Sequence, residues 1–243
     1  MTARAMVLCL VLAGSAFAQG RPEFDIDATP IHATFNHALP PGSFISVVDL
    51  NVPSEAAKEF EKGNRSIAKQ NWSKAAESLH KAVALYPAYA AAYNNLGVVY
   101  SHLGDSAQER EALQRAVSLN DHLALAYLNL GRMNIEAGNF PDAESLLNKA
   151  STLAPNDAVT LILLAYVEWT EQHFDAAVAV CRRAHALRAG HGFTHRVAAR
   201  VYEREKRISA AIDELQLCLK EEPDAPWAEA VRKELAVLQA IPH

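Results

Sequence analysis

Two histidines stand four residues apart in the segment His191-Gly-Phe-Thr-His195, and a third, His185, precedes them. Histidines at this spacing on one helix face can share a metal ion through their ring nitrogens. We expect His191 to lie in the turn before a helix, however, and no nearby carboxylate or cysteine completes a ligand set. We therefore interpret them as ordinary surface histidines, and we predict no metal site and no cofactor.

The sequence motifs of common catalytic sites are absent. There is no glycine loop that would cradle a phosphate, no G-x-S-x-G turn and no H-E-x-x-H zinc helix. We therefore predict no catalytic residues and a function that depends on binding. An enzyme or a metal-dependent protein is the third-ranked alternative, which an equimolar metal content after purification without a tag would support.

Residues suited to binding another protein gather in the later half of the chain. Arg196, Arg200 and Arg204 are spaced by four and share one helix face, and arginine pairs well with carboxylates and phosphates. An apolar and aromatic floor is expected from Leu125, Leu128, Ile162, Tyr166 and Trp169. This set predicts a peptide or helix partner with apolar anchors and an acidic end. In the alternative interpretation, some aromatics belong to the core and the arginines pair in solvent with Glu203 and Glu205.

A repeat of 34 residues must position these side chains. Small residues recur at this step in one column, which contains Gly63, Gly97, Gly131, Ala165 and Ala199. A second column contains Ala75, Ala143, Ala177 and Ala211, with Glu109 as its misfit. Large apolar residues recur as Trp72, Phe140, Phe174 and Ile208. A small residue at this period indicates helix pairs whose backbones approach closely.

These columns, together with Tyr93-x2-Leu96-Gly97-x2-Tyr100, resemble the tetratricopeptide (TPR) repeat. The resemblance implies an all-α, right-handed α-solenoid of five helix pairs and a C-terminal capping helix. The implied repeats are 56–89, 90–123, 124–157, 158–191 and 192–225, followed by a capping helix and tail at 226–243. Trp227, Val231, Leu235 and Leu238 are spaced by roughly a helical turn, as a capping helix requires.

In such arrays the first helix of each repeat lines a concave groove. The resemblance then implies a peptide-binding set: Asn64, Asn95, Val98, Leu125, Leu128, Asn129, Arg132, Ile162, Tyr166, Trp169, Phe193, Arg196, Arg200 and Arg204. Asn95 and Asn129, one repeat apart, match a ladder that holds a peptide backbone in some TPR proteins, because an amide both donates and accepts. Alternatively, asparagine is simply common at this position. A chaperone-tail clamp is rejected, because Phe60, Leu125 and Asn129 stand where it needs basic residues.

Local signals predict turns and buried thiols. Gly104 and Gly138 suit a left-handed helix end, and Gln70, Gln172 and Lys206 occupy the same position without glycine. Ser54 is expected to cap the first helix. We expect Cys181 and Cys218 to be buried thiols rather than a disulfide.

The amino terminus predicts export. Residues 1–18 read as a signal peptide with an Ala16-Phe17-Ala18 cleavage site before Gln19, which implies a periplasmic or extracellular protein. Residues 19–54 are rich in proline and read as a flexible leader, in which 44–50 could dock on the first repeat or on another chain.

We therefore predict a non-enzymatic scaffold that binds a protein or peptide in its concave groove, with roles in envelope assembly or secretion. The alternative is a structural protein that self-associates through 44–50 or a terminal repeat. The net charge of −5 gives no argument for nucleic acid, and no membrane span is expected.

Overall fold

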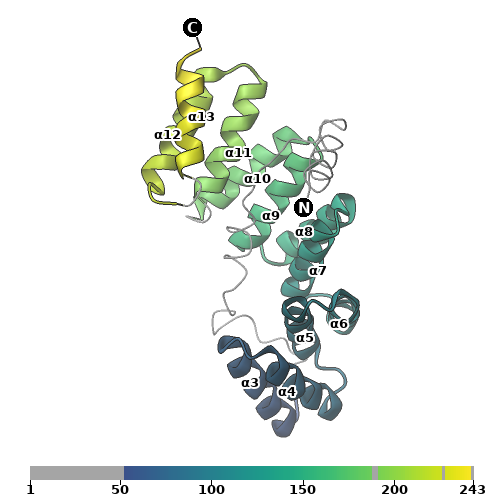
Figure 1. Cartoon of the computed structure of the whole chain (residues 1–243). Coiled ribbons are helices and arrows are strands. Elements are labelled where there is room, and N and C mark those ends of the chain that lie inside the picture. Colours follow the sequence, from purple (N-terminus) through teal and green to yellow (C-terminus); the bar gives the residue numbers. More distant parts are fainter. Residues whose placement is uncertain (1–51, 188–190, 226–227, 242–243) are drawn as a thin grey trace, which may run out of the picture.

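The repeats fold into successive helix pairs that stack in one direction (Figure 1). The structure is a computed structural model that describes residues 52–187, 191–225 and 228–241, and it contains only helices in these residues. The first helices of the pairs are α3 (Ser54–Ala68), α5 (Ala90–Leu103), α7 (Ala124–Glu136), α9 (Ala158–Thr170) and α11 (His191–Arg204). The second helices are α4 (Trp72–Leu85), α6 (Ser106–Leu119), α8 (Phe140–Leu153), α10 (Phe174–Ala186) and α12 (Ile208–Glu221), and α13 (Ala228–Gln239) follows. The described residues therefore form an α-solenoid of five helix pairs with a closing helix.

The glycine column exists because each first helix lies against a leucine of its own second helix. A Cβ atom added at Gly63 would lie 2.7 Å from Leu79 Cγ, and one at Gly131 would lie 2.7 Å from Leu147 Cγ. Both distances are too short for a side chain, so the small residue is needed for close packing. In the fourth repeat alanine replaces glycine as Ala165, and the position equivalent to the leucine carries the smaller Cys181.

The turns within the helix pairs adopt one backbone conformation with or without glycine. Gly104 and Gly138 have φ values of 76° and 75°, in the left-handed region. Gln70, Gln172 and Lys206 adopt the same region, with φ values of 54°, 67° and 60°. The left-handed conformation expected at this position is therefore present in all five turns, and a side chain disfavours it.

The ends of the described array differ from the sequence prediction in one detail. Ser54 does not cap α3, because Pro53 precedes the helix and Ser54 is its first residue. At the other end, α13 buries Val231 and Leu238 against Ala199 and Leu215. The predicted signal peptide at 1–18, the segment 44–50 and Trp227 lie outside the described residues.

Cys181 and Cys218 are free and buried, as predicted. Burial raises the pKa of Cys181 and that of Cys218 to about 12, so both stay as thiols at neutral pH. Among the residues that the structure describes, no helix has the length and apolar character needed to cross a bilayer.

Candidate functional site

The first helices of successive repeats contact one another and form the inner face of the array. Contacts join α3 to α5, α5 to α7, α7 to α9 and α9 to α11, in addition to the contacts within each pair. Side chains that project from these helices away from their own second helices therefore form one surface. All of the predicted groove residues lie on these helices.

Four asparagines form a hydrogen-bonded row across α3, α5 and α7. Asn129 Nδ2 donates to Asn94 Oδ1 at 2.9 Å, and Asn94 Nδ2 donates to Asn95 Oδ1 at 3.1 Å. Asn95 Nδ2 in turn donates to Asn64 Oδ1 at 2.7 Å. Asn94 and Asn95 are buried, whereas Asn64 and Asn129 at the two ends are only half-buried. Asn64 and Asn129 each make one hydrogen bond within the row, so the amide of each has further donor or acceptor groups.

Arg132 points toward the second helix α6 and not along the inner surface. Its guanidinium donates to Glu109 at 2.8 Å and to Ser101 at 3.0 Å, and it donates to Glu136 on its own helix at 2.6 Å. Glu109 is the misfit of the alanine column, and it is buried beside this arginine. Burial raises the pKa of Glu109, and the charge of Arg132 opposes this shift. The positive charge of Arg132 therefore balances the negative charge of the buried Glu109.

The predicted apolar floor is divided between the core and the surface. Leu128 and Trp169 are 6% exposed and belong to the core of repeats three to five. Leu125, Ile162 and Tyr166 are half-buried against the same core, and Val98 is half-buried on α5. Trp169 therefore lies in the interior rather than on the exposed floor expected from the sequence.

An aromatic and arginine stack links α9, α10 and α11. The rings of Trp169 and Phe174 meet edge to face with centroids 5.1 Å apart, and the Arg204 guanidinium lies 4.3 Å from the Phe174 centroid. This is the geometry of a cation–π contact. Sequence reasoning assigned Phe174 only to packing, yet it joins a core residue to an exposed cation.

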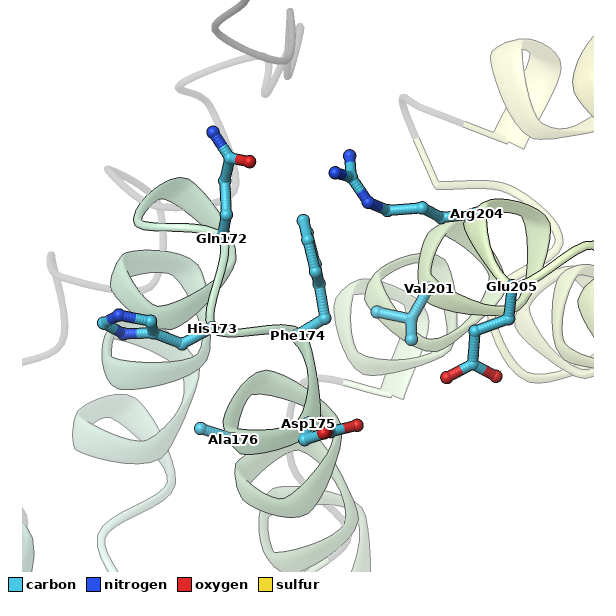
Figure 2. Close-up of a pocket in the computed structure, with 8 residues that line it drawn as sticks. All are labelled: Gln172, His173, Phe174, Asp175, Ala176, Val201, Arg204 and Glu205. Atoms are coloured by element: carbon cyan, nitrogen blue, oxygen red, sulfur yellow. The ribbon is translucent and has the colours of Figure 1, made fainter.

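A pocket of about 470 Å³ opens beside this stack, between the α9–α10 turn and the last turn of α11. Figure 2 shows Phe174 standing between Gln172 and Arg204, with the carboxylates of Asp175 and Glu205 at the other end of the pocket. The pocket therefore offers an aromatic wall, one cation and two carboxylates.

The other predicted arginines differ from Arg204 in their surroundings. Arg200 bonds Glu203 at 3.3 Å and Glu234 of α13 at 3.2 Å. Arg196 is half-buried. Of Phe193 only the backbone is described, in α11. Of the predicted arginines, Arg204 lines the pocket, whereas Arg200 is held between two carboxylates.

Several histidines have partners that sequence reasoning missed. His102 stacks on Trp72 with ring centroids 3.8 Å apart, and His173 contacts Glu168 at 3.0 Å. His191 is the first residue of α11 rather than part of a preceding turn.

The interpretation of His195 as a surface histidine is wrong, because it is 6% exposed and contacts Glu214 and Glu221 of α12. Those carboxylates are 19 and 26 residues away in sequence, so local spacing could not reveal them.

Comparison with protein families identifies the repeats directly. A TPR repeat model matches residues 63–104, and two tetratricopeptide repeat models match 90–122 and 110–158. The comparison with curated proteins gave no match.

Solved structures share the fold at low sequence identity. PilW, described as a widely conserved type IV pilus biogenesis factor, is 14% identical with a TM-score of 0.67, over 77% of this chain and 87% of PilW. YrrB, described as a TPR protein with an unusual peptide-binding site, is 19% identical with a TM-score of 0.62, over 73% and 92%. MamA is 20% identical with a TM-score of 0.61, over 70% and 92%. The family models, the repeat period and the helix-pair fold agree that this chain is a tetratricopeptide repeat protein.

Proposed function

We propose that this protein is a non-enzymatic scaffold that binds an extended segment of another protein along the inner face of its first helices. The observation that carries the proposal is the asparagine row from Asn64 to Asn129. The half-buried amides of Asn64 and Asn129 at the two ends suit a peptide backbone, because an amide can both donate and accept a hydrogen bond. The bonds within the row fix the amides before a partner arrives, which lowers the entropy cost of binding.

The pocket beside Phe174 supplies the second contact. An apolar side chain of the partner would pack on the Phe174 ring, and an acidic group would meet Arg204. Asp175 and Glu205 repel an acidic segment at the other end of the pocket, so the partner carries its negative charge on one side only. The acidic partner expected from the sequence is therefore restricted to a segment whose negative charge lies on one side.

Export to the cell envelope is part of the proposal and rests on the predicted signal peptide at 1–18. Type IV pilus biogenesis is stated for PilW, which shares this fold. A role in assembling an envelope complex would agree with both observations.

Affinity capture from an envelope fraction tests the binding site. The site variant is Asn129→Ala with Arg204→Glu, and the matched control on the second helices is Asn148→Ala with Arg115→Glu. We expect one or more proteins to be captured by the wild type and the control but lost with the site variant. Identical capture by all three proteins would show that the inner face is not the binding site.

Self-association remains the alternative, and light scattering separates it from scaffold function. A monomer that stays monomeric at high concentration would exclude the self-associating protein. A stable oligomer that dissociates after deletion of residues 44–50 would support it instead.

A further inference from the structure

A second cluster of polar side chains lies at the other end of α10 and α11, away from the pocket. His185 lies near the end of α10, His195 lies in the first half of α11, and Glu221 is the last residue of α12. One ligand atom from each of these three residues lies within 4.8 Å of the others. The three side chains come from three helices, so the packing of repeats four and five brings them together.

His195 is held in an orientation suited to binding a metal ion. Its Nδ1 atom lies 2.6 Å from Glu214 Oε2, and its Nε2 atom lies 3.2 Å from Glu221 Oε2. A carboxylate that accepts the Nδ1 proton leaves the Nε2 lone pair pointing at Glu221. Histidines that bind metals commonly donate their other ring N–H to a carboxylate in this way.

The spacing of the donor atoms fits a tetrahedral ion. Ligand atoms that each lie about 2.0–2.1 Å from zinc are separated by about 3.3 Å, close to the 3.2 Å between His195 Nε2 and Glu221 Oε2. The His185 ring stands edge-on to the His195 ring with centroids 4.9 Å apart. His185 is exposed, so its ring can turn toward the same point without disturbing the core.

We propose that His185, His195 and Glu221 bind one Zn²⁺ ion, with Glu214 orienting His195 and a water molecule in the fourth position. Two imidazoles and a carboxylate suit Zn²⁺, whereas Ca²⁺ and Mg²⁺ prefer oxygen ligands alone. The ion would fasten α10, α11 and α12 together and stiffen the last two repeats. The proposal does not depend on the partner-binding site.

Protons compete with the ion at His195. Burial lowers the pKa of His195, but the hydrogen bonds and charges of Glu214 and Glu221 outweigh burial and raise it overall. Because the imidazole must be neutral to bind a metal, zinc binding weakens as the pH falls.

The test is a titration of the purified protein, freed of any affinity tag and treated with a chelator, with Zn²⁺ followed by calorimetry and with Co²⁺ followed by visible absorption. We expect one equivalent to bind and the melting temperature to rise. His185→Ala removes an exposed ligand and should leave the fold intact while weakening zinc binding at least about tenfold. Glu221→Gln should have a similar effect, and the two substitutions together should abolish binding.

Two control variants make the result specific. His122→Ala removes an exposed histidine whose ring contacts the neighbouring Asp121, and it should leave zinc binding unchanged. His173→Ala disrupts the other histidine and carboxylate group, formed with Glu144 and Glu168, and it should also leave binding unchanged. Absence of stoichiometric binding, or binding that is lost with His173→Ala and kept with His185→Ala, would overturn the proposal.

Discussion

Repeats two and three differ from repeats four and five in how they use polar side chains. In the earlier pair, Asn94, Asn95 and Asn129 bond mainly to one another, and Arg132 neutralises Glu109 inside the array. In the later pair, polar groups gather at the ends of helices, where Arg204 lies on Phe174 and His195 lies between two glutamates. The same repeat can therefore pair its polar groups inside the array or gather them toward the ends of its helices.

The largest expected effect tests whether the aromatic group of repeat four is structural. Trp169→Ala should lower the free energy of unfolding by about 4 kcal/mol, because it removes a buried indole and leaves a cavity. Urea denaturation measures the loss. Leu103→Ala, at a residue that is 46% exposed, serves as the control and should change stability little. A loss below about 1 kcal/mol for Trp169→Ala would place the indole on the binding surface after all.

The next effect concerns the buried ion pair of repeats two and three. Glu109→Ala restores the alanine of the column but leaves Arg132 without its buried partner, at a cost of about 3 kcal/mol. The double variant Glu109→Ala with Arg132→Leu should recover most of this loss, because no charge is then buried. Stabilities from denaturation of the four proteins in this cycle give the coupling energy. A double variant as unstable as Glu109→Ala would contradict compensation between the two residues.

A smaller effect concerns the pH dependence of stability, which we expect to arise from Glu234 on the closing helix α13. Burial, together with the nearby carboxylate of Glu203, raises the pKa of Glu234 from 4.5 to about 7, although Arg200 opposes the shift. Glu203 Oε1 and Glu234 Oε1 are buried without a hydrogen-bond partner among the described residues, and a proton shared between them would satisfy both.

The folded protein therefore keeps a proton that the unfolded chain releases. The stabilisation is fully present below pH 4.5 and is lost as the pH rises through about 7. We expect stability to fall by about 2 kcal/mol between pH 5.5 and pH 8. Denaturation of Glu234→Gln over the same range should show a much flatter dependence, and an unchanged slope would assign the titration to another group.

The smallest effect compares turns that have glycine with those that lack it. Gln172→Gly should stabilise the protein by about 1 kcal/mol, because it relieves a left-handed backbone at φ 67°. Gly104→Ala should destabilise it by a similar amount through the backbone alone, since an added Cβ atom would meet no atom within 4 Å. Thermal melting of both variants measures the difference. If both substitutions shifted the melting temperature in the same direction, the result would argue against backbone strain.

The fold was predictable because each column of the repeat has one physical requirement. The position that faces the second helix keeps a small residue in all five repeats, and the turn within each pair keeps a positive φ whether or not it carries glycine. Side-chain partners were less predictable, because contacts such as that between Arg132 and Glu109 join different repeats. A usable signal was present, since Glu109 breaks its alanine column and Arg132 is a charged residue that could balance it. The residues around His195 offered no such signal, because the carboxylates lie on another helix.

Site-specific photocrosslinking tests the central claim that the inner face binds a partner. A photoreactive phenylalanine analogue would replace Val98 on α5 in one protein and the exposed Gln114 on α6 in the other. After irradiation in an envelope extract, we expect a defined covalent adduct at position 98 and none at position 114. Adducts only at position 114, or none at position 98 while a partner is still captured, would contradict binding along the inner face.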